Sequence, residues 1–160
     1  MRKIILVRHA TAEPERYPIK DFDRNLDETG INESQKLGRF IKSKKEAPFQ
    51  IYSSSANRTS QTSKIIIHET SMEMSNLQLI PTLYNAGYQI LLSLIQAAPN
   101  SCPLLVVVGH NPGISQIATV LSNQESYQLS PGSALCLEFN CSLWKDISGE
   151  AGKETWYFIP

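Results

Sequence analysis

The chain of 160 residues has few of the side chains that usually bind metals, with three cysteines and three histidines. The cysteines form no Cys-x-x-Cys pair, and none begins the spacing between cysteine and arginine that cysteine phosphatases use. We interpret Cys102, Cys136 and Cys141 as reduced structural thiols. No His-Glu-x-x-His motif is present either, so we expect no metal, and we expect no other cofactor.

Net charge is also missing, because 15 basic side chains (Lys and Arg) balance 15 acidic ones. This balance argues against a general binder of nucleic acid or of anionic membranes, although it leaves room for a local positive pocket. No apolar run approaches the roughly 20 residues of a membrane helix, and the run after Lys3 stops at Arg8, too early for a signal peptide. We expect one cytoplasmic domain over residues 1–160, with neither nucleic acid nor membrane as a partner.

Short apolar runs alternate with longer helical patterns along the chain. The sequence predicts strands at 3–7, 50–54, 103–108, 134–139 and 155–159, with a weaker candidate at 78–80. It predicts helices at 31–44, 56–68 and 88–98, and a fourth helix that begins after an Asn111 N-cap with Pro112 as its first residue. Such alternation predicts an α/β fold with a mainly parallel sheet and helices on both faces.

Polar residues follow three of the predicted strands. Arg8 and His9 follow the first strand, Arg58 follows the second after a short loop, and His110 follows the strand at 103–108. The carboxyl ends of parallel strands share one edge of the sheet, where ligands collect, so we expect these four side chains to converge.

The position of Arg58 indicates an anion at this edge. If Ser55 caps the second helix, Arg58 lies at position N3, where a cation opposes the helix dipole by roughly 0.3–1 kcal/mol. An anion would offset that penalty, and the helix that begins beside His110 adds free backbone N–H groups that suit phosphate. Two arginines, two histidines and two helix N-termini therefore predict a pocket for a phosphoryl group, which phosphate or sulfate can also occupy.

Four blocks of the sequence resemble a known family. LVRHA (6–10), DFDRNLDETG (21–30), SSSANRTSQT (53–62) and VVGHNPGI (107–114) are similar, in that order, to signature segments of the histidine phosphatase superfamily. The block at 21–30 resembles the small SixA-type phosphohistidine phosphatases in particular. Three positions depart from the family pattern, since Ala10 replaces a glycine and Asn25 and Ser55 each replace a proline.

The resemblance implies a phosphoglycerate mutase-like fold, a three-layer α/β/α sandwich, and a hydrolase that needs no metal. It implies that His9 is the nucleophile and becomes transiently phosphorylated, while Arg8 and Arg58 clamp the phosphoryl oxygens. His110 would donate a further hydrogen bond to these oxygens. The second-rank candidates for phosphate binding, at the rim of the pocket, are Arg24 and Asn111.

One family feature is absent, the carboxylic acid that protonates an alkoxide leaving group. Mutase-like relatives carry it after the middle strand, where this chain reads IPTLYNAGYQ (80–89). An imidazole leaving group is much less demanding because it can depart as a weak base, whereas general acid catalysis of ester cleavage is typically worth about 10²–10⁴-fold. The candidates for a replacement acid lie in the loop after the first strand: Glu13, Asp21 and Asp23.

The sequence also leaves little room for a lid, and its longest candidate is the loop at 11–28. An open site suits phosphohistidine on another protein, so we expect a SixA-like phosphatase that acts on a histidine phosphotransfer domain. Two alternatives stay open. One is a phosphomonoesterase that hydrolyses a small phosphorylated metabolite with a loop carboxylate as its acid. The other is a non-catalytic phospho-binding module, which would need the arginines but no nucleophile.

Overall fold

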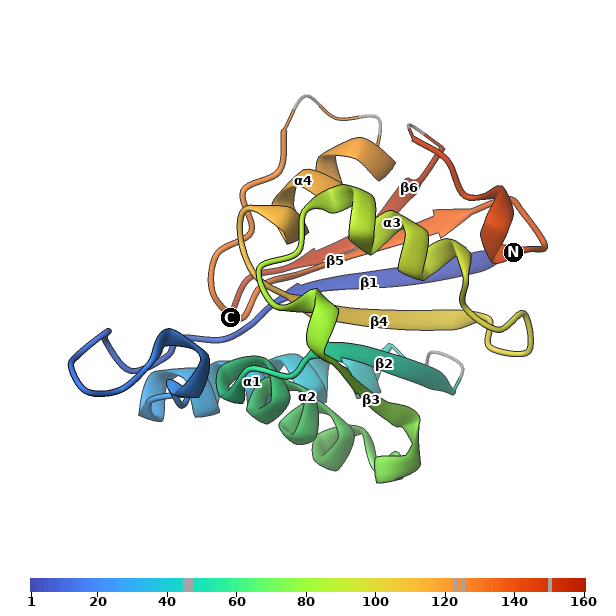
Figure 1. Ribbon diagram of the computed structural model, residues 1–160. Helices are drawn as coiled ribbons and strands as arrows, with labels where there is room; N and C mark the ends of the chain where they lie inside the picture. The colour runs from blue at the N-terminus through green and yellow to red at the C-terminus, as the bar shows by residue number, and fades with distance from the viewer. Residues whose placement is uncertain (45–47, 123, 125, 150) are drawn as a thin grey trace.

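The computed structural model describes residues 1–44, 48–122, 124, 126–149 and 151–160. Six strands form one sheet: β1 (Arg2–Arg8), β2 (Phe49–Ser54), β3 (Leu77–Ile80), β4 (Leu104–Gly109), β5 (Ala134–Phe139) and β6 (Lys153–Phe158). Their order across the sheet is β3-β2-β4-β1-β5-β6 (Figure 1). β4 pairs in parallel with β1 and β2, and β2 with β3, whereas β5 is antiparallel to both of its neighbours. The prediction of a mainly parallel sheet is confirmed.

Helices cover both faces of this sheet (Figure 1). They are α1 (Glu28–Ser43), α2 (Asn57–Thr70), α3 (Tyr88–Gln96) and α4 (Gly113–Leu121). α1 and α2 pack together on one face, and α3 and α4 lie together on the other. The three-layer sandwich is therefore confirmed, although α3 ends before its predicted last residue, Ala98. Within the described residues, no helix is both long and apolar enough to cross a membrane.

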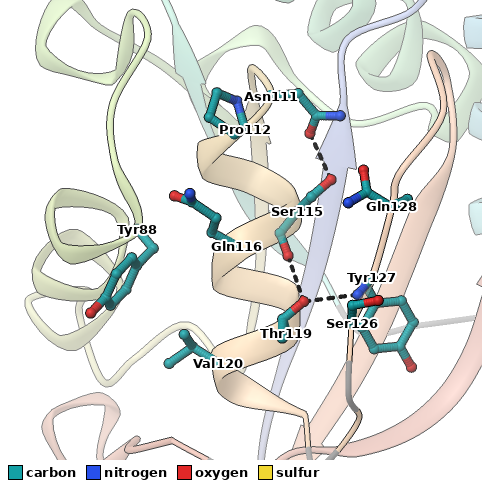
Figure 2. Close-up of a pocket in the computed structure, with 10 residues that line it drawn as sticks. All are labelled: Tyr88, Asn111, Pro112, Ser115, Gln116, Thr119, Val120, Ser126, Tyr127 and Gln128. Carbon is teal, nitrogen blue, oxygen red and sulfur yellow. Dashed lines mark hydrogen bonds between the residues drawn. The ribbon is translucent and has the colours of Figure 1, made fainter.

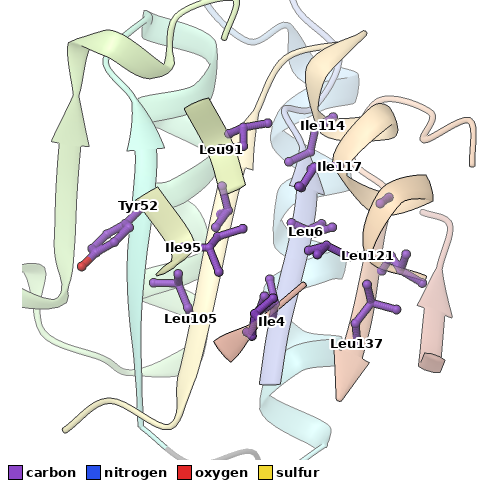
Figure 3. Close-up of a cluster of buried hydrophobic side chains, with 14 of the residues drawn as sticks. Ile4, Leu6, Tyr52, Leu91, Ile95, Leu105, Ile114, Ile117, Leu121 and Leu137 are labelled. Carbon is purple, nitrogen blue, oxygen red and sulfur yellow. The ribbon is translucent and has the colours of Figure 1, made fainter. Parts of the chain in front are cut away.

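The side chains of β1 anchor this strand on both faces. Ile4 and Leu6 pack under α3 and α4 (Figure 3), while Ile5 and Val7 pack under α1 and α2, and all four are fully inaccessible to solvent. Such burial on both faces explains why the strand reads as a continuous apolar run. Each of these side chains contributes about 1.5–3 kcal/mol on burial. The carboxyl end of β1 is therefore held in a fixed position.

The start of α2 differs from the prediction. Ala56, and not Ser55, is the N-cap, so the helix begins at Asn57 and Arg58 is its second residue rather than its third. The cause is Ser54, whose Oγ accepts the backbone N–H of Ala56 at 3.3 Å and keeps the chain extended up to that residue. Arg58 still lies in the first turn of the helix.

The start of α4 also differs. Pro112 is the N-cap and Gly113 is the first helical residue, so the predictions of Asn111 as N-cap and Pro112 as first residue were wrong by one position. The amide of Asn111 makes other contacts. Its Nδ2 donates to the backbone oxygen of Leu129 at 3.0 Å, and its Oδ1 accepts from Oγ of Ser115 at 2.7 Å.

The loop between β1 and α1 is closed at its base. Ala12 and Leu26 form an isolated antiparallel bridge, and the short 3-10 helix η1 (Asp21–Asp23) lies in the loop between them. Gly30 permits the close approach of this base to α1, because a Cβ there would lie 1.9 Å from the backbone oxygen of Thr11. The bridge between Ala12 and Leu26 therefore returns η1 to the edge of the sheet where the parallel strands end.

Candidate active site

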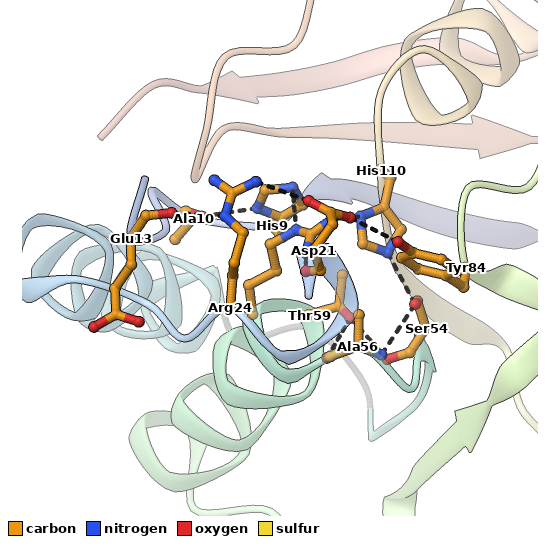
Figure 4. A network of polar contacts seen from close by, with 11 residues as sticks. His9, Ala10, Glu13, Asp21, Arg24, Ser54, Ala56, Thr59, Tyr84 and His110 are labelled. Carbon is orange, nitrogen blue, oxygen red and sulfur yellow. Dashed lines mark hydrogen bonds and ion pairs between the residues drawn. The ribbon is translucent and has the colours of Figure 1, made fainter. Parts of the chain in front are cut away.

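The carboxyl ends of β1 and β4 place two imidazoles side by side. The parallel register pairs Arg8 with Gly109, so His9 and His110 leave adjacent strands at the same level. Their ring centroids are 5.2 Å apart, with the rings edge to face (Figure 4). His9 is partly accessible, whereas His110 is 5% exposed.

Arg58 connects the two imidazoles. Its Nε donates to Nε2 of His9 at 3.2 Å, and its Nη2 lies 3.3 Å from Nδ1 of His110. Nη1 and Nη2 also donate to the backbone oxygen and to Oδ2 of Asp21, the latter at 2.9 Å. Asp21 thus holds the edge formed by Nη1 and Nη2, and the edge formed by Nε and Nη2 faces the histidines. A planar guanidinium fixed in this way is oriented to donate two hydrogen bonds to a phosphoryl group.

The contacts of His9 define its tautomer. Nδ1 lies 2.8 Å from the backbone oxygen of Ala10, which can only accept, so we assign the proton to Nδ1 and a lone pair to Nε2. The pKa of His9 is lowered to about 4, chiefly by burial, against an opposing effect of the Ala10 contact. Positive charges add to the lowering, from Arg58, Arg8 and Arg24. His9 is therefore neutral near pH 7, with a nucleophilic nitrogen at Nε2.

His110 is neutral as well. Its Nε2 lies 2.9 Å from Oγ of Ser54, and its Nδ1 faces Arg58. The pKa of His110 is lowered to about 3, chiefly by burial and also by the neighbouring His9 and Arg58, against a smaller opposing effect of Asp21. Both imidazoles of the cluster formed by His9, Arg58 and His110 are thus kept free of charge near pH 7.

Asp21 is the carboxylate that contacts this cluster. The hydroxyl of Tyr84 donates to its Oδ2 at 2.7 Å, and Nη1 of Arg24 donates to its Oδ1 at 2.8 Å. Burial alone would raise the pKa of Asp21, but hydrogen bonds outweigh it and hold the pKa well below its usual range. Their donors are Tyr84, Arg58 and Arg24. Asp21 is therefore ionised near pH 7 and has no proton to donate.

Three other predicted residues lie around the cluster. Nη1 of Arg8 donates to the backbone oxygen of Leu129 at 2.9 Å, and Nδ2 of Asn111 donates to the same oxygen. Nε of Arg8 is buried and has no hydrogen-bond partner among the described residues. Arg24 donates from Nε to the backbone oxygen of Glu13 at 2.7 Å, which ties this arginine to the loop after β1.

The other two candidate acids are placed differently from Asp21. Figure 4 shows the carboxylate of Glu13 directed away from both imidazoles. Asp23 is exposed, and its backbone oxygen accepts from Nδ2 of Asn57 at 3.0 Å. Of the three loop carboxylates, all of them described, Asp21 is the one bonded to Arg58.

The comparison with protein families agrees with this geometry. The profile of the histidine phosphatase superfamily (branch 1) matches residues 4–83, half of the chain. The chain belongs to this superfamily. The matched segment contains His9 and Arg58 of this histidine phosphatase, and it ends before His110.

Relatives of this histidine phosphatase match nearly its whole length. An uncharacterized chloroplastic protein of Arabidopsis thaliana is 27% identical over 97% of this chain and 74% of its own length. A protein of Nakamurella multipartitia described as the phosphohistidine phosphatase SixA has a TM-score of 0.84, with 22% identity over 99% of this chain and 96% of that chain. A mycobacterial glucosyl-3-phosphoglycerate phosphatase has a TM-score of 0.67, with 12% identity over 96% of this chain and 97% of that chain. These similarities show a shared phosphoglycerate mutase-like fold.

Sequence reasoning missed two polar contacts of this histidine phosphatase, those of Ser54 and Tyr84. Tyr84 lies in the segment where the carboxylic acid was expected, and its ring also packs edge to face on His110, with centroids 5.4 Å apart. The sequence signal that could have identified Tyr84 is its hydroxyl group, a hydrogen-bond donor in the segment where the acid was expected. The sequence contains no signal that identifies Ser54, because it lies in a run of three serines that only the fold distinguishes.

A hollow of about 480 Å³ lies along α4 (Figure 2), and none of the three residues of the cluster is among its described lining residues. α3 and the segment 126–128 form its other walls, and none of its described lining residues is charged. Asn111 is the predicted site residue that lines it. In the described parts of the chain, no group of three or more His, Cys, Asp or Glu side chains is placed to hold a metal ion.

Proposed function

We propose that this histidine phosphatase removes phosphate from phosphohistidine on another protein, through a covalent phosphohistidine at its own His9. The observation that carries the proposal is the lone pair on Nε2 of His9, which the Nδ1 contact with Ala10 fixes and which lies 3.2 Å from Nε of Arg58. Phosphoryl transfer to nitrogen requires a neutral nucleophile and guanidinium donors at one point.

In the first step, Nε2 of His9 attacks phosphorus in line with the leaving group. The bond between Nε2 and phosphorus forms while the bond from phosphorus to the substrate nitrogen breaks, and the electron pair leaves with that nitrogen. The phosphoryl oxygens accept the N–H donors of Arg58 that otherwise point at the histidines. The Nε–H of Arg8, which has no partner among the described residues, is the further donor that we propose. This exchange uncovers the lone pair of His9 as the phosphoryl group binds.

In the second step, water attacks the phosphorus of the phosphorylated His9. The bond between phosphorus and Nε2 breaks, its electron pair returns to Nε2, and the water oxygen leaves as part of inorganic phosphate. The protons of the water pass to phosphate and solvent. The lowered pKa of His9 assists this step, because a weakly basic imidazole is a good leaving group. Protein charges supply the stabilisation, so the mechanism requires no metal ion.

The carboxylates of the site favour cleavage of a P–N bond over a P–O bond. Asp21 is ionised through its contacts with arginines, and the carboxylate of Glu13 is directed away. An alkoxide leaving group needs a proton donor, whereas an imidazole that carries a proton on its other ring nitrogen departs as a neutral, weak base. The higher TM-score of the SixA structure than of the glucosyl-3-phosphoglycerate phosphatase supports the same choice. A histidine phosphotransfer domain is therefore the proposed substrate.

The hollow along α4 favours one alternative, a phosphomonoesterase that acts on a small metabolite. In this alternative, the uncharged part of a small ester occupies the hollow, whose lining includes Asn111, the residue after His110. That reaction would require a protonated carboxyl, and Asp21 would have to lose its arginine contacts to gain the proton.

The test compares two substrates, a phosphorus-32-labelled histidine phosphotransfer domain and β-glycerol phosphate, a small alkyl ester with an alkoxide leaving group. We expect faster release from the domain, unchanged by a metal chelator, with label trapped on the wild-type enzyme by an alkaline quench. His9→Ala should show neither label nor release. His68→Ala is the matched control, because its side chain is 87% exposed. Faster hydrolysis of the small ester would contradict the proposed substrate, and release by His9→Ala would contradict the nucleophile.

A further inference from the structure

Ser54 contacts His110 at the nitrogen that does not face Arg58. It is the last residue of β2, is fully buried, and places Oγ 2.9 Å from Nε2 of His110. The same oxygen accepts the backbone N–H of Ala56. A serine hydroxyl accepts and donates at once, so Ser54 can serve Nε2 of His110 in either role.

The contacts of His110 permit two positions for its proton. With Nη2 of Arg58 donating to Nδ1, the proton lies on Nε2 and is donated to Ser54. With the proton on Nδ1, the hydroxyl of Ser54 donates to Nε2 instead. The titratable and charged groups that face this ring are His9, Arg58, Asp21 and Tyr84.

The two positions differ in what His110 offers to a phosphoryl oxygen. In the first, Nδ1 presents a lone pair toward Arg58, and a lone pair repels an anionic oxygen. In the second, Nδ1–H donates to that oxygen beside the donors of Arg58. Burial lowers the pKa of His110 to about 3 in the protein with no anion bound, so the ring is neutral near pH 7 before a phosphoryl group binds. A neutral His110 can bind the phosphoryl group only as the second tautomer.

We propose that Ser54 is a positioning residue that turns its hydroxyl from acceptor to donor and so shifts the proton of His110 from Nε2 to Nδ1 as a phosphoryl group binds. The inference rests on the proposed phosphoryl site, and it names the residue that lets a neutral histidine donate there. Exchange with solvent water moves the proton, and the ring carries one proton before and after.

The decisive measurement is nitrogen-15 NMR of the histidine rings, with and without tungstate, a tetrahedral dianion. We expect Nδ1 of His110 to change from an unprotonated to a protonated chemical shift on addition of tungstate, while Nε2 changes in the opposite sense. A ring that keeps its proton on Nε2, gains a second proton or does not respond to tungstate would overturn the proposal. This measurement uses the wild-type protein, so it does not depend on any variant folding.

Two serine variants separate this role from a structural one. Ser54→Ala removes the hydroxyl and should lower kcat/KM by about tenfold, the effect of one hydrogen bond, and abolish the tautomer change. Ser53→Ala is the matched control, because Ser53 is equally buried and its hydroxyl donates to a backbone oxygen at 2.9 Å. It should keep the tautomer change. Retention of the change in Ser54→Ala would refute the proposal.

The outcome is distinguishable from a failure of the proposed function. If wild-type enzyme releases no phosphate and His9 is never labelled, the proposed function fails, whatever the tautomer of His110. If phosphate is released through His9 but the tautomer stays fixed, the role of Ser54 alone is refuted.

Discussion

Titration of the site histidines from about pH 7.5 to about pH 3.5 tests whether the fold keeps the nucleophile neutral. The pKa of His9 is lowered from 6.5 to about 4, which corresponds to about 3 kcal/mol against protonation. At pH 5, a ring with the ordinary pKa is only about 3% neutral, whereas His9 is about 90% neutral. The enzyme should therefore hold about thirtyfold more nucleophile at pH 5 than an ordinary histidine would supply.

Nitrogen-15 NMR of the rings measures these titrations directly, and His9→Asn and His110→Asn assign the signals. The exposed ring of His68 provides a comparison in the same sample. In Arg58→Gln, the pKa of His9 should rise only part of the way to 6.5, because burial is the largest cause of its lowering and remains in the variant. Midpoints near 6.5 for both site histidines in the wild-type protein would refute the argument from burial.

Three further predictions follow from the same contacts. The unfolded chain binds protons on its histidines below about pH 6.5 while the folded site resists them, so the free energy of unfolding should fall as pH drops. His110→Asn should make this fall shallower by up to about 1.4 kcal/mol per pH unit near pH 5, measured by urea unfolding. Asp21→Asn weakens two arginine contacts and should lower kcat/KM by about tenfold, whereas the exposed Asp23→Asn should not. Gly30→Ala places a Cβ 1.9 Å from the backbone oxygen of Thr11 and should lower the free energy of unfolding by about 1–3 kcal/mol. An unchanged free energy of unfolding would contradict the close packing of Gly30 on Thr11.

The layers of the fold were predictable because apolar periodicity is a local property. The run at 103–108 is buried on both faces of the sheet, and six strands were located close to their observed positions. The helix starts were less predictable. At α2 the hydroxyl of Ser54 accepts the backbone N–H of Ala56, and at α4 the amide of Asn111 donates to the distant backbone oxygen of Leu129, and each helix starts one residue later than predicted.

The sequence by itself determined that His9, Arg58 and His110 meet, because strand ends in a mainly parallel sheet share one edge whatever the details of packing. Only the tertiary structure decided that Asp21, and not Glu13 or Asp23, reaches Arg58. Those three carboxylates lie in one loop, and the path of a loop depends on contacts between distant residues such as the bridge of Ala12 with Leu26. The same holds for the protons, since the contact with Ala10 fixes the tautomer of His9, the contact with Ser54 permits two positions for the proton of His110, and both contacts exist only in the folded chain.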